Sequence, residues 1–355
     1  MSRRPNAAAF ATTWLAPLVA LLIAAIVGDI LILSFGQAPG DVYRLLIEGT
    51  WGNAYGLGQV LYKATTLTFT GLAVALGLRA GLFNIGAEGQ LAAGGFMAAM
   101  AGLLIPAGTP VILAAPFCMV AAALGGGVVG AVPGALKARF GASEVIVTIM
   151  LNFIVLAFLN YIVATKLHVG ESLHTPPINA GALPRLSDFA VSFHGSAANA
   201  TILLALITAV VFGWFLFRTR AGYDLRATGL QPDAAEYGGI SVAREHFRAM
   251  TLAGALAGLG GVNYVLGYKQ YYEEGFAAGA GFLGIAVALV GRNHPAGVPL
   301  AALLFATISQ GGLAVNAIVP KQMVEVLTAV VIIAVAVTVP EVQRLVGSAV
   351  RRGTT

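Results

Sequence analysis

Charged residues and cysteine are scarce in this sequence. Only 10% of its 355 residues are Asp, Glu, Lys or Arg, whereas soluble domains carry about 25%. The single cysteine, Cys118, excludes an intrachain disulfide, and its position in an apolar run indicates a small buried side chain. A soluble chain of this length could not hide so much apolar surface in one core, so the composition excludes an ordinary soluble domain.

Motifs for enzymatic chemistry are also missing. None of the five lysines is followed by Ser or Thr, which excludes a phosphate-binding loop of the Walker type. The five histidines form no HExxH motif or other closely spaced set of metal ligands, and no GxSxG nucleophile elbow occurs. The sequence therefore predicts no enzymatic activity, no bound metal and no cofactor for this chain.

Apolar residues dominate what is present. They make up 58% of the chain and give a mean hydropathy of +0.85, and 45 glycines accompany them. A membrane-spanning helix needs about 20 apolar residues, and small residues let such helices approach closely. We therefore predict an all-α, polytopic membrane bundle that forms one domain over residues 1–355. Ten spanning helices are expected, near residues 12–35, 62–80, 86–105, 111–136, 144–165, 199–217, 247–268, 280–292, 298–316 and 323–340.

Two places in this pattern are not ordinary connections between helices. Residues 81–85 are all that separates the second expected helix from the third, and the eighth, 280–292, is short and flanked by glycine. Non-helical backbone at membrane depth is tolerated where protein or a water-filled cavity covers it. The eighth segment is therefore expected to be tilted, broken or re-entrant.

The distribution of Lys and Arg predicts the orientation in the membrane. With ten spans and a cytoplasmic N-terminus, 14 of the 20 basic residues lie inside and six outside, in agreement with the positive-inside rule. Both termini are then cytoplasmic, and the pI of about 9.4 reflects loop charge rather than nucleic-acid binding. The longest outer segments, 36–61 and 166–199, are either solvated loops or contacts for a protein that delivers substrate.

One sizeable charged loop, Arg218–Arg248, connects two of the expected spans on the cytoplasmic side. It is basic, and its centre is rich in Gly and Ala. A polytopic membrane protein without an energy source of its own needs a surface on which another protein can act. We interpret this loop as the docking surface for a separate motor subunit.

Polar residues among glycines mark a candidate element of a transport pathway. In Gly81–Gln90, the side chains of Asn84, Glu88 and Gln90 lie beside glycines that include Gly86, at the start of an expected helix. Ionisable residues at membrane depth are costly and usually face protein or water. The segment is either a gate between two half-spans or a packing turn whose polar side chains satisfy exposed backbone groups.

Thr148 and Asn152 form a second candidate pair. They lie four residues apart on one face of an expected helix that Ser143 is suited to cap. The pair either lines an aqueous path or makes hydrogen bonds between helices.

Asp29, inside the first apolar run, is either an ion relay or a residue near the outer interface. Arg292 is interpreted as an anchor at the cytoplasmic interface.

Three stretches resemble the permease subunits of bacterial ABC importers. They are RAGLFNIGAEGQ (79–90), GLQPDAAEYGGISVAREHFRAMTLAGALAGLGG (229–261) and GAGFLGIAVALVGRNHPAG (279–297), and together they cover about a fifth of the chain. They are similar to signatures of the branch that handles simple sugars, nucleosides and branched-chain amino acids. SEVIVTIMLNFI (143–154) is most similar to the nucleoside-type permeases, although Ser143 stands where Asn is more usual.

The resemblance implies an ATP-driven importer in the bacterial inner membrane. A binding lipoprotein would deliver a small polar solute, a nucleoside or a simple sugar, to a pathway formed by two permease subunits, here expected to be paralogues. Two cytoplasmic ATPases would bind ATP and Mg²⁺ and move a coupling helix, which falls near Pro232–Gly239 in this chain. Small residues would enter a groove of the ATPase, and charged residues would contact its rim. The small residues are Ala234, Ala235 and Gly238, and the charged residues are Arg226, Asp233, Glu236 and Arg244.

An ion-coupled secondary transporter or channel is the alternative. Its coupling acids would be Asp29 and Glu88, and an ion gradient rather than ATP would drive uptake. A membrane-embedded enzyme or scaffold would need a catalytic constellation, which the sequence lacks.

Overall fold

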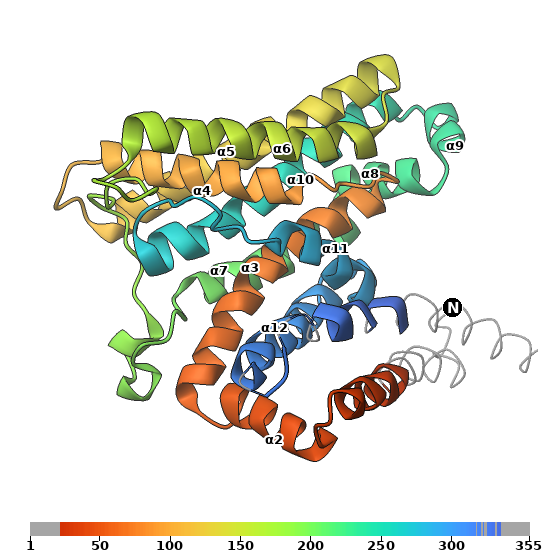
Figure 1. Ribbon diagram of the computed structural model, residues 1–355. Coiled ribbons are helices and arrows are strands. Elements are labelled where there is room, and N and C mark those ends of the chain that lie inside the picture. Colours follow the sequence, from red (N-terminus) through yellow and green to blue (C-terminus); the bar gives the residue numbers. More distant parts are fainter. Residues whose placement is uncertain (1–21, 317, 321, 323–324, 331, 335–355) are drawn as a thin grey trace, which may run out of the picture. The chain divides into compact units, whose positions relative to one another are not determined.

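The computed structural model describes residues 22–316, 318–320, 322, 325–330 and 332–334. Helices make up the regular structure of these residues (Figure 1), and the β-type pairs among them are isolated bridges such as His174–Glu273. The prediction of an all-helical fold is therefore confirmed. The α-helices include Leu22–Ser34 and α2 (Pro39–Thr50), α3 (Ala54–Arg79), α4 (Ala87–Leu104), α5 (Val111–Phe140), α6 (Glu144–Ile162), α7 (Thr201–Arg218), α8 (Arg220–Leu230), α9 (Pro232–Tyr237), α10 (Val242–Tyr264), α11 (Ala280–Val290) and α12 (Gly297–Val315). Short π-helical turns follow α6 (Val163–Leu167) and α10 (Val265–Lys269).

Six of the described helices are long and apolar enough to cross a membrane, so the chain is a multi-pass membrane protein. They are Ala54–Arg79, Val111–Phe140, Glu144–Leu167, Thr201–Arg218, Val242–Lys269 and Gly297–Val315, and each coincides with one of the expected spans. Leu22–Ser34 and Pro39–Thr50 pass the same test as a pair bent by 111°. The start of the first expected span and the end of the tenth fall outside the described residues, so the total of ten stays a prediction.

Two of the expected spans differ from long helices that face lipid: α11 is too short to cross a membrane, and α4 is buried inside the bundle. α11 has 11 residues, about 16 Å of helix, which is too short to cross a hydrocarbon core of roughly 30 Å. It begins after Gly279, whose φ of 83° lies in the left-handed region that favours glycine, and it ends before Gly291. α4 has 18 residues, and most of them are buried. α4 is therefore an inner helix of the bundle.

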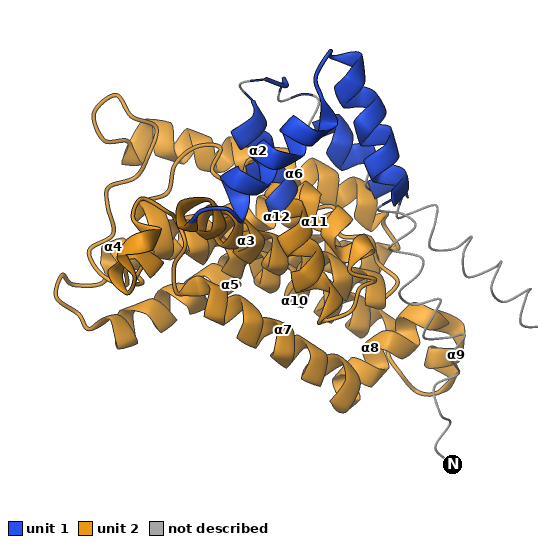
Figure 2. Ribbon diagram, turned by 90° about the horizontal axis from the view of Figure 1, so that it is seen from below, with its two compact units in different colours: residues 1–53, 307–355 blue, residues 54–306 orange. Residues whose placement is uncertain are grey.

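The chain divides into two compact units (Figure 2). Unit 2 is the continuous segment Ala54–Ala306, which holds α3 to α11 and the start of α12. Unit 1 combines Met1–Asn53 with Thr307–Thr355. In the described part of unit 1, the small apolar core consists of Ile32, Val42, Val315 and Val319.

Direct backbone contact at glycines builds the core of unit 2. α5 packs along α10, and α4 packs against both (Figure 1). Gly126 and Gly130 of α5 face Gly254 of α10 so closely that a Cβ on Gly254 would overlap the carbonyl oxygen of Gly126. Gly94 of α4 meets Gly258 of α10 in the same way. Small residues at these positions let three helices meet, which larger side chains would prevent.

Residues 166–199, which were expected to form a long outer loop, are irregular, as predicted. It contains two 3₁₀ turns, Leu186–Asp188 and Val191–Phe193. Backbone hydrogen bonds fix it to the residues that follow α10: the N–H of Thr175 donates to the carbonyl of Tyr272 (2.8 Å), and that of Ile178 donates to the carbonyl of Gln270 (2.7 Å). The loop is therefore packed on the protein rather than merely solvated.

Candidate functional site

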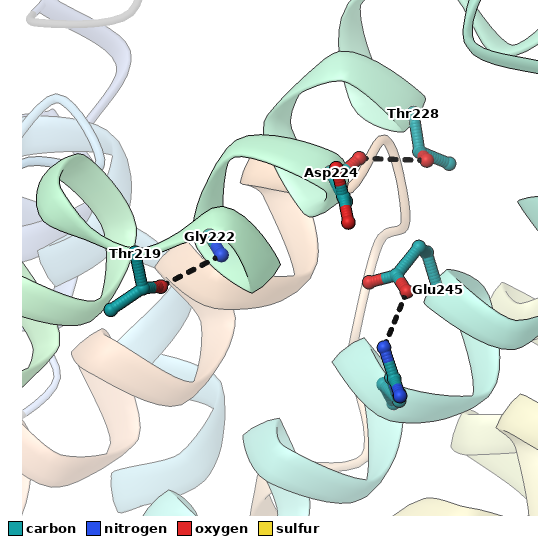
Figure 3. Close-up of polar contacts among 6 residues, drawn as sticks. Thr219, Gly222, Asp224, Thr228 and Glu245 are labelled. Carbon is teal, nitrogen blue, oxygen red and sulfur yellow. Dashed lines mark hydrogen bonds and ion pairs between the residues drawn. The ribbon is translucent and has the colours of Figure 1, made fainter. Parts of the chain in front are cut away.

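A short separate helix projects between α8 and α10. Thr219 opens α8, because its Oγ1 accepts a hydrogen bond from the N–H of Gly222 (3.0 Å; Figure 3). Pro232 occupies the first position of α9, and Gly239, with a φ of 84°, lies just beyond its end. A six-residue helix thus forms where the resemblance implied a coupling helix. Figures 1 and 2 show α9 at the end of α8, at the margin of unit 2.

A cavity of about 600 Å³ lies between α8, α9 and the start of α10. Its lining carries charges of both signs: Arg220 and Asp224 come from α8, and Arg244, Glu245 and Arg248 come from α10. Glu245 is buried, and its Oε1 lies 2.8 Å from the Nη1 of Arg248 (Figure 3). Such a mixed, partly enclosed surface suits a partner that presents charged groups of both signs.

The seven residues expected to contact a motor subunit do not all lie in one place in the structure. Four of them line this cavity, namely Ala234, Ala235, Gly238 and Arg244. Asp233 and Glu236 lie on α9 outside the lining and are exposed. Arg226 lies on α8 with its guanidinium carbon 5.3 Å from the ring centroid of Phe217. Ala235 is only 6% exposed, so its side chain packs against the chain itself.

Two exposed apolar side chains in this segment were not singled out from the sequence. Tyr237, the last residue of α9, is 98% exposed, and Leu230, the last residue of α8, is 84% exposed. Aromatic side chains are enriched at the centres of protein interfaces. The available signal was an aromatic residue in a stretch of small and polar residues, directly before Gly238 and Gly239.

The turn between α3 and α4 lies against α8. Gly81 in this turn has a φ of 75°, which favours glycine, and a Cβ on it would stand 3.2 Å from the Cα of Gly229. A Cβ on Gly229 would overlap the carbonyl oxygen of Arg79. The two backbones therefore touch without intervening side chains, and a displacement of α8 would press on the turn.

A buried amide network holds the unwound residues before α4. Asn84 and Gln90 exchange two hydrogen bonds, from Nδ2 to Oε1 (2.9 Å) and from Nε2 to Oδ1 (3.1 Å). The Oδ1 of Asn84 also accepts from the N–H of Gly86 (3.0 Å). A Cβ on Gly86 would lie 3.1 Å from the Cβ of Thr148, so the position is tight. These contacts are those of a packing turn, and a role as a gate stays a prediction.

Asn152 of α6 ties that helix to the start of α4. Its Oδ1 accepts from the N–H of Gly89, and its Nδ2 donates to the carbonyl of Ile85, both at 2.9 Å. Thr148, one turn earlier, is buried, and its hydroxyl donates to the carbonyl of Glu144 (2.7 Å). The bond of Asn152 to Gly89 thus joins α6 to α4, whereas that of Thr148 lies within α6, and a role of the pair in lining an aqueous path stays a prediction.

Glu88 joins the N-terminal ends of two helices. It lies in the first turn of α4, is 5% exposed, and accepts hydrogen bonds from the N–H groups of Gly279 (2.8 Å) and Gly281 (2.7 Å). Helix N-termini carry unpaired amides and partial positive charge, which a carboxylate complements. Glu88 therefore fixes the N-terminal end of the short helix α11 to α4.

Asp29 and Arg292 lie outside these networks. The hydroxyl of Tyr43 donates to the Oδ1 of Asp29 (2.8 Å), and both residues belong to the bent helix pair of unit 1. Arg292 follows α11 with a φ of 57° and is half-buried. Within the described ranges, no group of His, Cys, Asp and Glu residues has the arrangement of a metal site.

Comparison with known proteins shows the family to which this chain belongs. The family described as branched-chain amino acid transport system / permease component matches residues 56–336. The chain is 36% identical to the nucleoside ABC transporter permease protein NupB of Lactococcus lactis subsp. cremoris, over 91% of this chain and 90% of NupB. It is also 36% identical to the guanosine ABC transporter permease protein NupP of Bacillus subtilis, over 91% of this chain and 92% of NupP. Identity to the glucose ABC transporter permease protein TsgB13 of Haloferax volcanii is 31%, over 90% of this chain and 87% of TsgB13. The chain therefore belongs to the family of branched-chain amino acid transport system permease components.

Proposed function

We propose that this chain is a permease subunit of an ABC importer and forms part of the membrane pathway for a nucleoside. Two relatives at 36% identity are named as nucleoside and guanosine permeases, whereas the relative named as a glucose permease is 31% identical. The observation that carries the proposal is the separate helix α9, which presents an exposed Tyr237 beside a charged cavity. A projecting helix of this kind offers a partner protein a point on which to push.

The energy comes from a separate cytoplasmic ATPase, which binds the ATP and Mg²⁺. A push on α9 would move α8, because Gln231 alone separates the two helices. α8 touches the α3–α4 turn through Gly229 and Gly81, and the α4 that follows holds α11 through Glu88. Close-packed elements transmit displacement, so this contiguous series of contacts supports coupling from α9 to the interior of unit 2.

The proposed orientation places α9 and both termini in the cytoplasm of a bacterial inner membrane. The excess of basic residues on that side, 14 of 20, supports it. The packed loop that contains Thr175 and Ile178 then faces outward, where it would receive a substrate-binding lipoprotein. A second permease subunit, a paralogue of this chain, would complete the pathway across ten spans per subunit.

The acids that an ion-coupled mechanism would use are engaged by fixed groups of the protein. Both carboxylate oxygens of Glu88 accept backbone hydrogen bonds, and Asp29 accepts one from Tyr43. These contacts give both acids structural roles, so we favour the ATP-driven mechanism.

Transport by the reconstituted importer tests the proposal. Proteoliposomes would hold the two permease subunits, the ATPase and the binding protein, and uptake of radiolabelled guanosine would be compared with that of glucose. We expect guanosine uptake that requires ATP and persists when the proton gradient is collapsed. Ion-driven uptake by this chain alone would overturn the ABC mechanism, and a preference for glucose would overturn the nucleoside assignment.

A further inference from the structure

Two arginines from different helices share one aromatic ring at the end of α7. The guanidinium carbon of Arg79, the last residue of α3, lies 5.9 Å from the ring centroid of Phe217. That of Arg226 on α8 lies 5.3 Å from the same centroid. The ring of His294 lies 5.9 Å from that of Phe217. We call these four residues of unit 2 the arginine cluster.

The arginine cluster carries positive charge without a carboxylate partner. Guanidinium groups stay protonated in proteins, and among the described residues neither Arg79 nor Arg226 forms an ion pair with a carboxylate, unlike Arg44, Lys137 and Arg248. The Nε of Arg226 is buried and has no hydrogen-bond partner among the described residues. A buried charged donor without a partner is costly, so a bound anion would stabilise this arrangement.

Neighbouring groups of the protein compensate only part of this charge. The Nε of Arg79 donates to the carbonyl oxygen of Asn293 (3.0 Å), just beyond the end of α11. Helix C-termini carry partial negative charge, roughly half an elementary charge each, and the face of Phe217 attracts cations weakly. Two full positive charges set against these partial charges leave the cluster positive.

The position of the arginine cluster indicates which anion it meets. α3 ends at Arg79 and α7 ends at Arg218, one residue after Phe217, and both helices are long and apolar enough to span the membrane. On α7, Val210 is 73% exposed and Trp214 is 61% exposed, as expected of a face turned to lipid. The ends of spanning helices lie at the level of the lipid headgroups. The cluster therefore lies where a headgroup phosphate would lie.

We propose that the arginine cluster binds the phosphodiester of an anionic phospholipid, whose acyl chains lie along α7. Guanidinium groups recognise phosphate oxygens through paired N–H donors, and basic residues at the cytoplasmic surface attract anionic lipid. A phosphate held by both Arg79 and Arg226 ties α3 to α8, close to the contact of Gly229 with the α3–α4 turn. Bound lipid would thus steady the segment that carries α9.

The proposal is tested by lipid binding to the full chain in nanodiscs. Phosphatidylglycerol is titrated into phosphatidylcholine discs, and bound phosphatidylglycerol is measured by native mass spectrometry. Arg226→Gln is expected to weaken binding more than tenfold, because it removes a charge-assisted hydrogen bond to the phosphate in addition to the general attraction of one positive charge. Arg218→Gln is the matched control, because it removes the same charge next to Phe217 from an exposed side chain outside the cluster. It is expected to change binding far less.

Three outcomes would overturn the lipid site. Equal weakening by Arg226→Gln and Arg218→Gln would show diffuse attraction, and inorganic phosphate that binds as tightly without anionic lipid would assign the cluster to a soluble anion. Weaker binding of the ATPase subunit to Arg226→Gln, with phosphatidylglycerol binding unchanged, would assign the cluster to a protein interface. Gel filtration checks that each variant folds. If Arg226→Gln does not fold, Arg226→Lys replaces it in the binding measurement, because lysine keeps the charge but loses the paired donors. Its binding is expected to lie between those of Arg218→Gln and Arg226→Gln, and binding equal to that of the unsubstituted chain would contradict the paired-donor site.

Discussion

The backbones of Gly81 and Gly229 are in direct contact, since a Cβ on Gly81 would stand 3.2 Å from the Cα of Gly229. Gly81 belongs to the turn between α3 and α4, and Gly229 belongs to the last turn of α8. This is where the charged segment that carries α9 meets the inner helices of unit 2. The contact gives a physical route from the proposed docking surface on α9 to the interior of unit 2.

A methyl group at Gly229 should break this route. In Gly229→Ala the Cβ would overlap the carbonyl oxygen of Arg79, which is backbone and cannot rotate away. Overpacking of this kind costs about 1–3 kcal/mol, so we expect a lower midpoint of thermal unfolding and a loss of ATP-driven uptake. Gly40→Ala in α2, where a Cβ would meet nothing within 4 Å, is the control. Full uptake by Gly229→Ala would show that the contact is not needed.

Two adjacent glycines on α5 give a matched pair for the helix packing. In Gly126→Ala the Cβ would overlap the carbonyl oxygen of Gly254, whereas in Gly127→Ala it would lie 3.6 Å from the Cβ of Ala255. We expect Gly126→Ala to lower the free energy of unfolding by about 1–3 kcal/mol. Gly127→Ala should be neutral or stabilising, because glycine costs about 0.5–1 kcal/mol within a helix. Equal stabilities of the two variants would contradict the close backbone packing.

Glu88→Gln should loosen the start of α11. The substituted amide has one acceptor oxygen, so one of the N–H groups of Gly279 and Gly281 loses its partner, at a cost of about 1–3 kcal/mol. We expect faster hydrogen exchange at these two amides and slower uptake. Glu171→Gln, at an exposed glutamate, is the control. Unchanged exchange at both amides would mean that Glu88 does not hold α11.

Tyr237→Ala should separate docking from folding. Because the side chain is 98% exposed, its removal should leave thermal unfolding unchanged. An interface hot spot contributes about 2 kcal/mol or more, so binding of the ATPase should weaken by more than tenfold, as measured by titration in nanodiscs. Ala235→Arg would be a poor test, since that side chain is 6% exposed and a long charged replacement is expected to disturb the fold. Unaltered ATPase affinity in Tyr237→Ala would remove this residue from the interface.

Asp29→Asn distinguishes the two energy sources. An asparagine oxygen can still accept the hydrogen bond from Tyr43, so we expect the variant to fold and to retain ATP-driven uptake. Uptake that disappears in this variant while the ATPase remains active would favour ion coupling.

The features that were predictable from the sequence depend on local signals. Helix α9 was expected from the family resemblance, and Pro232 at its start and the glycines after Tyr237 are local signals that agree with its bounds. The shortness of α11 follows from Gly279 and Gly291 in the same way. Six of the expected spans were found because their apolar runs are long.

The partners of the polar side chains were not predictable. Glu88 and the amides it binds are 191 and 193 residues apart, and no local pattern specifies such a pairing. A six-residue helix is also too short for a periodic pattern to show which side chains face outward. Small size therefore suggested Ala235 as a docking residue, whereas the structure buries it and exposes Tyr237.

The proposed action of the ATPase on α9 from the cytoplasm is tested most directly by crosslinking. Cys118→Ala removes the native cysteine, and Glu236→Cys supplies one exposed thiol beside Tyr237. The importer is assembled in inside-out vesicles with an ATPase subunit that carries one surface cysteine. A short bifunctional maleimide is then added to the vesicles. We expect a crosslink between the two subunits, and no labelling of intact cells by a membrane-impermeant maleimide. Labelling of intact cells without a crosslink would contradict the proposed mechanism.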